Sequence, residues 1–226
     1  MTSAMPAPQG AELRRARERD LVAATRALFD ERGMQDAPIE EIARAVGIAR
    51  GLIYRHFSSK EELFVLTVTD YLQELDAVLS ATVGADGDQV DQLERWARAY
   101  AQFCARYPAF LDCALSLMHR PARELYDMLS ESVWLRLGQG IAKCVDHVSG
   151  LLARGVATGV FPAVDDPDYV ANVLWTQTLG TMHLARIRVG IRQAAPGIPE
   201  LFALETERVV ESCVHSALAT CGCAAR

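Results

Sequence analysis

In nearly every periodic segment of this chain, apolar residues recur among polar ones with the spacing of a helix. From about Glu12 to Arg32, for example, Leu21, Ala24 and Leu28 recur at steps of three and four residues. This spacing places them on one face of a helix. No convincing run of strictly alternating apolar and polar residues interrupts it, so the pattern predicts an all-α chain.

Glycine, proline and capping residues divide the pattern into successive helices. We expect helices at about 12–32, 38–46, 50–56, 60–82, 89–106, 109–118, 122–158, 165–190 and 200–219. Four glycines within 122–158 predict that this segment is bent or broken. The clearest linker is the stretch from Gly84 to Asp88, which separates an N-terminal third from the rest of the chain.

Two short helices joined at Gly47 have the arrangement of a helix-turn-helix. Apolar residues of this region are expected to pack inward against Leu28 and Phe29, namely Ile39, Ile42, Val46, Ile48, Ile53 and Phe57. The second helix would then stand out from the surface, where it could enter a major groove about 12 Å wide. On spacing alone, an ordinary helical corner with exposed arginines explains the pattern equally well.

A longer set of residues bears on this choice. It consists of Leu28-Phe29-Asp30-Glu31-Arg32-Gly33, Ile39-Glu40-Glu41-Ile42-Ala43, Gly47-Ile48, Gly51-Leu52-Ile53-Tyr54-Arg55-His56-Phe57 and Ser59-Lys60-Glu61-Glu62-Leu63-Phe64. These residues closely resemble the N-terminal domain of TetR/AcrR-type transcriptional regulators, without a gap over roughly 19–64. Beyond them the chain is similar to such regulators only in the number and length of its helices.

The resemblance implies a homodimeric DNA-binding regulator, usually a repressor, that a small molecule releases from its operator. It implies an N-terminal three-helix helix-turn-helix DNA-binding domain at 1–64, followed by a C-terminal helical ligand-binding and dimerisation domain at 65–226. The operator would be pseudo-palindromic double-stranded DNA, because two recognition helices of a two-fold dimer must fit successive major-groove faces.

The same resemblance assigns roles in DNA binding by position. Tyr54, His56 and Lys60 match the residues that contact phosphates, and Lys60 at a helix start could add its charge to the helix dipole. We expect Arg50 and Arg55 to read base edges, because arginine to guanine is the commonest specific contact. Arg44 is a candidate clamp on the DNA backbone.

Further positions are less decided. The arginines Arg14, Arg15, Arg17 and Arg19 could contact phosphates, but a solvated helix face is an equally good interpretation. Ala37 and Ala49 stand where the family usually has hydroxyl residues ahead of the two short helices. Each loses a potential helix cap, which typically contributes about 1 kcal/mol, although Asp36 could replace the first of them.

The net charge of −6 is unexpected for a protein that binds a polyanion, but it is unevenly distributed. Up to Phe64 the chain has 10 basic and 10 acidic residues, whereas the remainder has 13 and 19. The acidic excess therefore belongs to the predicted effector and dimerisation part, and the predicted DNA-binding part is neutral.

The stretch from Tyr169 to Ala185 contains no charged residue. A helix with a solvated face normally carries charge there, so this helix should be covered by its own domain and by a second copy of the chain. The last helix is its expected companion. The residues predicted for these buried dimer surfaces are Leu174, Trp175, Thr178, Leu179, Met182, Phe202, Val209, Val210, Cys213 and Ala217.

Aromatic and polarisable residues are concentrated between the linker and these helices, as expected for an apolar cavity with a few polar groups. The candidate effector pocket consists of Trp96, Tyr100, Phe103, Cys104, Phe110, Met118, His119, Tyr126, Trp134 and His147. Taken singly, each of them is better explained as a core residue. As a set they predict a hydrophobic or aromatic effector, because no cluster of charge accompanies them.

Two alternatives remain open. Cys213 and His215, with Cys221 and Cys223, could form a metal- or redox-sensing site, although residues two apart point to different sides of a helix. An enzyme is the more distant alternative, because the chain has no glycine-rich phosphate loop, nucleophile elbow or paired zinc histidines. We expect no cofactor and no metal, no membrane partner, and a cytoplasmic protein with reduced thiols.

Overall fold

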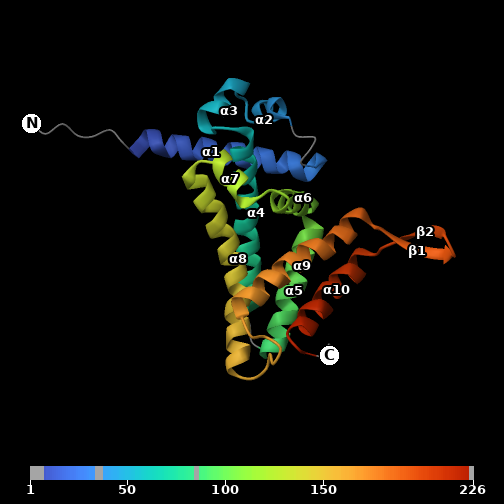
Figure 1. Ribbon diagram of the computed structural model, residues 1–226. Coiled ribbons are helices and arrows are strands. Elements are labelled where there is room, and N and C mark those ends of the chain that lie inside the picture. Colours follow the sequence, from blue (N-terminus) through green and yellow to red (C-terminus); the bar gives the residue numbers. More distant parts are fainter. Residues whose placement is uncertain (1–7, 34–37, 84–86, 224–226) are drawn as a thin grey trace, which may run out of the picture. The chain divides into compact units, whose positions relative to one another are not determined.

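The computed structural model describes residues 8–33, 38–83 and 87–223. Within these ranges the chain forms ten helices and one two-stranded hairpin (Figure 1). In chain order the elements are α1 (Pro8–Arg32), α2 (Ile39–Ala45), α3 (Arg50–His56), α4 (Lys60–Val83), α5 (Gln89–Arg106), α6 (Pro108–Met118), α7 (Ala122–Met128), α8 (Glu131–Ala157), α9 (Pro167–Ile187), β1 (Val189–Ala195), β2 (Ile198–Ala203) and α10 (Thr206–Thr220). The predicted all-α class is confirmed.

The chain divides into two compact units. The first contains the residues up to Asp70 together with Arg120–Leu137, and the second contains Tyr71–His119 together with Gly138 and the residues after it. The predicted domain boundary after Phe64 lies within α4, close to this division. The first unit also includes α7 and the start of α8, which lie outside the segment 1–64.

In the first unit, α1, α2 and α3 pack against one another. Their shared core is apolar and consists of Leu21, Leu28, Phe29, Ile39, Ile42, Ala43, Ile53 and Phe57. Phe29 also approaches Phe64 at the start of α4, with ring centroids 6.3 Å apart. Most of the residues predicted to pack against Leu28 and Phe29 of α1 are therefore buried. Val46 and Ile48 are only partly buried.

In the second unit, α5, α9 and α10 pack against one another, and α6 contacts both α5 and α9. Figure 1 shows α9 and α10 running side by side, with the hairpin extending from the end that they share. Two aspartates define helix starts by accepting backbone N–H groups: Asp88 from Asp91 at 2.9 Å and Asp166 from Tyr169 at 3.0 Å. Such N-caps satisfy donors that a helix leaves without an intrahelical partner.

One local prediction was wrong and a second is confirmed only in part. The segment 189–203 forms an antiparallel hairpin instead of the end of one helix and the beginning of the next, so the last helix begins at Thr206. The long segment 122–158 is broken, but at Leu129–Ser130 and at none of its glycines. The carbonyl of Ser130 accepts the N–H groups of Val133 and Trp134, both at 3.0 Å. A new helix, α8, therefore begins after Ser130 and separates from α7 there.

Candidate DNA-binding surface and effector region

The turn between α2 and α3 determines which face of α3 is exposed. Gly47 has φ +69°, a left-handed conformation that favours glycine. The turn is closed by the Ile48 N–H, which donates to the Ala43 carbonyl at 2.9 Å. Ile53 is on the inner side of α3 and is buried, so the opposite side of this short helix faces solvent.

That outer side carries the two predicted base-reading residues, Arg50 and Arg55, and the predicted phosphate contact Tyr54. Arg50, Tyr54 and Arg55 are all exposed. The Arg50 guanidinium is 2.7 Å from a carboxylate oxygen of Glu40 on α2. A hydrogen bond with Tyr54 and the charge of Glu40 together raise the pKa of Arg50. Arg50 must therefore exchange Glu40 for a DNA group if it is to read a base.

The remaining predicted DNA contacts flank α3. Arg44 is exposed on α2 and Lys60 is exposed at the first position of α4. His56 is half-buried at the end of α3, and its buried Nδ1 has no hydrogen-bond partner within 8–33, 38–83 and 87–223. The structure thus places all six predicted residues on α2, α3 and the start of α4. Their contacts with DNA remain a prediction.

The two alanines that replace hydroxyl residues ahead of α2 and α3 differ in what the structure describes. Ala49 precedes α3 with extended backbone and provides no side-chain cap, as the sequence indicates. Ala37 and its possible substitute Asp36 lie outside the described residues.

The sequence analysis missed a buried carboxylate at the junction of α3 and α4. Glu62 is only 6% exposed. One of its oxygens accepts the Ser58 N–H at 2.6 Å and the Ser58 hydroxyl at 2.8 Å, and the other accepts the Ser130 hydroxyl. Burial raises the pKa of Glu62, but the hydrogen bonds from Ser130 and Ser58 outweigh it, and the net pKa is lowered.

Glu62 therefore connects the turn after α3 to the turn before α8. The only sequence signal was the capping pattern Ser59-Lys60-Glu61-Glu62, in which the Ser59 hydroxyl accepts the Glu62 N–H at 3.1 Å. Ion pairs strengthen the same unit: Arg26 with Asp70 at 2.8 Å, and Arg136 with Glu18 at 2.6 Å.

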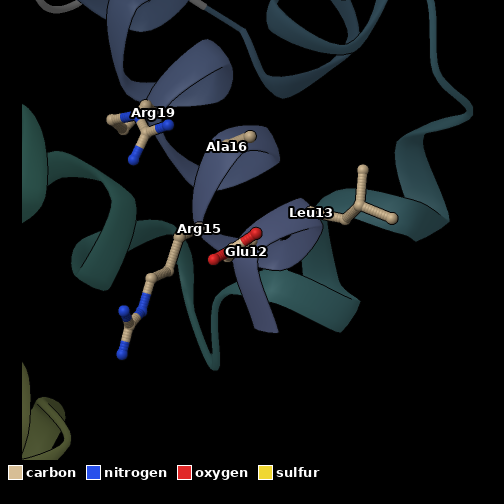
Figure 2. A pocket seen from close by; sticks show the side chains of 5 residues that line it. All are labelled: Glu12, Leu13, Arg15, Ala16 and Arg19. Atoms are coloured by element: carbon tan, nitrogen blue, oxygen red, sulfur yellow. The ribbon is translucent and has the colours of Figure 1, made fainter. Parts of the chain in front are cut away.

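The arginines near the start of α1 lie on an open surface. A shallow hollow of about 630 Å³ is lined by Glu12, Leu13, Arg15, Ala16 and Arg19. Figure 2 shows that all five side chains come from α1, so the hollow is not an enclosed cavity. Arg14 and Arg17 are exposed on the same helix. A solvated face and a phosphate-contacting face are both compatible with this arrangement.

Half of the predicted effector residues form one aromatic core in the second unit. Trp96, Tyr100, Phe103 and Cys104 of α5 and Phe110 of α6 are all buried. The Tyr100 ring stacks on Trp175 of α9, with centroids 4.4 Å apart and an interplanar angle of 18°.

Two polar atoms in this core are unsatisfied. The Trp96 Nε1–H and the Tyr100 hydroxyl are buried without a hydrogen-bond partner within the described part of the chain. Burial raises the pKa of Tyr100 well above its usual value, so its hydroxyl is protonated and can donate. A buried donor without a partner costs about 1–3 kcal/mol, and a bound molecule with an acceptor atom would remove that cost.

The other predicted effector residues lie elsewhere. Met118 and His119 are exposed at the end of α6. Tyr126 and Trp134 belong to the first unit, where their rings meet edge-on with centroids 5.7 Å apart. His147 is in the second unit, with its Nε2 2.7 Å from an Asp76 oxygen. The ten residues do not form one cluster.

A cavity of about 300 Å³ lies near the aromatic core. Its lining residues come from α5, α6, α9, the position between α9 and β1, and the start of α10: Cys104, Ala105, Pro108, Leu111, Met182, Ala185, Arg186, Arg188 and Thr206. Of the predicted effector residues only Cys104 is among them. The volume is at the lower end of the range for ligand pockets.

Most residues predicted for the dimer surfaces lie inside the protomer. Leu174, Trp175, Thr178, Leu179 and Met182 of α9 are buried against the chain's own helices, as are Val209, Val210, Cys213 and Ala217 of α10. Phe202 is half-buried on the hairpin. A partner would therefore meet the opposite faces of the same two helices.

The cysteines have the character of core residues. Burial raises the pKa of Cys213 to about 11 and that of Cys221 to about 12, which opposes the thiolate form that metal ligation requires. No group of three or more histidine, cysteine or acidic residues suited to a metal ion occurs within the described ranges. In the same ranges no helix is long and apolar enough to cross a membrane.

Comparisons with known proteins agree with this architecture. The sequence model "Bacterial regulatory proteins, tetR family" matches residues 21–66. The HTH-type transcriptional regulator BetI of Escherichia coli O45:K1 is 39% identical over 201 residues, covering 74% of this chain and 94% of the relative.

Solved structures show the same fold at low sequence identity. A regulatory protein of the tetR family from Rhodococcus RHA1 has a TM-score of 0.65 and 17% identity, covering 92% of this chain and 98% of its own. FadR from Bacillus subtilis, in complex with stearoyl-CoA, has a TM-score of 0.64 and 11% identity, covering 89% and 98%.

The helix-turn-helix of α2 and α3 lies within the matched residues, and the BetI relative is similar over most of its length. The chain belongs to the tetR family of bacterial regulatory proteins, which are DNA-binding transcriptional regulators and not enzymes.

Proposed function

We propose that this protein is a repressor that binds a pseudo-palindromic operator as a homodimer and leaves it when an apolar small molecule binds. The observation that carries the DNA-binding part is the outer face of α3, where Arg50, Tyr54 and Arg55 are exposed above a buried Ile53. Arginine and tyrosine on a protruding helix are suited to contact bases and phosphates in a major groove.

The exposed face of α9 supports a homodimer. Tyr169, Asn172, Thr176, Gly180 and His183 are exposed there, and none of them carries a formal charge at neutral pH. A solvated helix face normally carries charge, so this face is suited to burial against a second copy. Members of the family usually bind operators as dimers. Two recognition helices would then lie about 34–36 Å apart.

The effector is proposed to enter the aromatic core around Tyr100. Its surroundings are apolar, and the unsatisfied donors of Trp96 and Tyr100 could each donate to an acceptor atom of a bound molecule. An apolar molecule with a carbonyl or hydroxyl oxygen fits both features. The stearoyl-CoA complex of FadR provides an example of an acyl effector in a protein of the same fold. Binding acts on the operator only if the two dimer shapes differ in affinity for the effector.

Selection of preferred sites from random DNA, followed by binding assays with variants, tests the DNA-binding part. Arg55→Ala should relax base preference at defined operator positions. Lys60→Ala should weaken binding to all sites alike and should lower the slope of log affinity against log salt concentration by about 1, the value of one phosphate contact. Arg154→Ala, which removes an exposed arginine of the second unit, is the control. Unchanged binding by both test variants would show that α3 is not the recognition helix.

Release of the operator by a panel of apolar compounds tests the effector part. Tyr100→Phe keeps the ring and removes the hydroxyl, so it should raise the effective concentration of acceptor-bearing compounds about tenfold while leaving operator affinity unchanged. Tyr126→Phe removes an exposed hydroxyl of the first unit and serves as the control. If Tyr100→Phe responds to every active compound like the native protein, the effector binds elsewhere.

A further inference from the structure

The hairpin between α9 and α10 has two chemically different faces. Its register pairs Val189 with Ala203 and Ile191 with Leu201, and between them Gly190 with Phe202. Because side chains alternate between the faces of a strand, the first two pairs lie on one face. Gly190, Phe202 and the next pair, Arg192 with Glu200, lie on the other.

On the second of these faces, Arg192, Glu200 and Phe202 contact one another. Arg192 and Glu200 form an ion pair at 2.7 Å, and the Arg192 guanidinium lies 5.7 Å from the centroid of the Phe202 ring. The Phe202 ring also fills the space above Gly190, where a Cβ would collide with it. Aromatic and charged cross-strand neighbours of this kind stabilise a hairpin; on this face only Ile198 is a large apolar residue left exposed, at 58%.

The first face is apolar and uncovered. Ile191 is 73% exposed, Leu201 is 68% exposed and Val189 is 41% exposed. An isolated two-stranded hairpin is marginally stable in water, and independent stability requires packing of its apolar face. Within the described part of the second unit no element covers these three side chains, so together they form an exposed apolar face suited to contact a partner.

The apolar face continues the face of α9 that the proposed dimer uses. Leu184 is 43% exposed and Ile187 is 48% exposed on the last turns of α9, immediately before Val189 and Ile191 of β1. In Figure 1 the hairpin extends beyond the shared end of α9 and α10. The exposed apolar residues at the end of α9 and those of the arm are thus close together in the sequence, with Arg186 and Arg188 between them.

The chemistry of the hairpin disfavours a lipid surface. Membrane-binding surfaces combine basic side chains with exposed aromatic ones. Here the apolar face has no aromatic residue, and Arg192 is neutralised by Glu200. A face without charge agrees with the cores of contacts between subunits, where charged residues are depleted.

We propose that the hairpin 189–203 is a dimerisation arm, whose Val189, Ile191 and Leu201 face packs on the second copy of the chain. The inference rests on the proposed homodimer and adds to it a contact outside the helices. In a two-fold dimer each protomer extends its arm to the other, so both arms are buried and the assembly closes at two copies.

The first experiment measures the dissociation constant of the full-length dimer by sedimentation over a range of protein concentrations. The double variant Ile191→Lys and Leu201→Lys should weaken the dimer at least tenfold, because it would bury two charges per arm. Glu200→Gln alters the opposite face and should leave the constant within twofold of the native value. Far-UV circular dichroism checks that the helices of each variant remain.

A second experiment detects the contact itself. A photo-crosslinking phenylalanine analogue at position 191 should give covalent dimer on irradiation, whereas the same analogue at position 192 should not. If position 191 gives only intramolecular products, or if the double lysine variant dimerises as tightly as the native chain, the arm does not contact a second copy. A native chain that is monomeric at micromolar concentration would instead refute the homodimer in the proposed function.

Discussion

Replacing Glu62 by glutamine should destabilise the first unit, because the buried carboxylate accepts three hydrogen bonds. Two come from the N–H and the hydroxyl of Ser58, and one comes from the hydroxyl of Ser130. Glutamine retains a single acceptor oxygen, which can still serve the N–H and hydroxyl of Ser58. Its NH₂ group would then face Ser130, whose hydroxyl would have to turn and accept instead of donating, in a site that is only 6% exposed.

The magnitude follows from these contacts. A hydrogen bond to a charged acceptor contributes about 1.5–3 kcal/mol, so three give roughly 4–9 kcal/mol before the cost of burial. Burying a carboxylate costs several kcal/mol, and glutamine avoids part of that cost. We therefore expect a net loss of about 2 kcal/mol, a large fraction of the 5–15 kcal/mol that stabilises a typical native protein.

Urea unfolding at pH 7 and matched protein concentration, followed by far-UV circular dichroism, measures this loss. Glu61→Gln is a suitable control, because Glu61 shares the first turn of α4 and its helix dipole. It is half-exposed and should change the free energy of unfolding by no more than about 0.5 kcal/mol. If Glu62→Gln loses no more than Glu61→Gln, the hydrogen bonds from Ser58 and Ser130 do not stabilise the fold.

Three further outcomes are expected. The pKa of Glu62 is lowered in the folded protein. The stability that the ionised carboxylate contributes is therefore complete above the pKa of an unfolded glutamate, about 4.3, and is lost as the pH falls through the folded pKa. The difference in unfolding free energy between the native chain and Glu62→Gln should therefore shrink between pH 7 and pH 3. Gly155→Ala should destabilise by about 2–3 kcal/mol in urea unfolding because its Cβ would collide with the buried Phe161 ring, whereas Gly138→Ala, with open space around it, should stabilise by about 0.5–1 kcal/mol. Ellman's reagent at pH 8 should react quickly with Cys223, which is partly exposed, and slowly with the five buried cysteines; rapid reaction of a second thiol would contradict the burial described.

Helices α1, α2 and α3 were predictable because their signals are local. Gly47 and the spacing of Ile39, Ile42 and Ile53 were sufficient to predict the two short helices and the side that they bury. Glu62 was not identified as a hydrogen-bonding site, because its partner Ser130 is 68 residues away along the chain. Contacts of this range leave no pattern in a single sequence.

The hairpin was missed for a different reason. Its alternation is short, Pro196 and Gly197 interrupt it, and Pro199 lies within the second strand, where proline usually argues against a strand. The clearest sequence signal was Pro196-Gly197 between two short apolar runs, a typical turn dipeptide.

The predicted dimer residues show a limit of hydrophobic pattern. The uncharged stretch 169–185 correctly indicated burial of Leu174 and Met182, but apolar residues have the same spacing whether they face the protomer core or a partner. The predicted effector residues are limited in the same way. Trp96 and Trp134 were placed in one set by composition, and the structure assigns them to different units.

The stack of Tyr100 on Trp175 gives the protein an intrinsic optical reporter. Of the three tryptophans in the chain, Trp96 and Trp175 both lie beside Tyr100, with ring centroids 5.8 Å and 4.4 Å away. Trp134 belongs to the other unit. In a Trp134→Phe variant, the emission spectrum would come entirely from the aromatic core of the second unit, so occupancy of that core could be followed in real time without an attached dye.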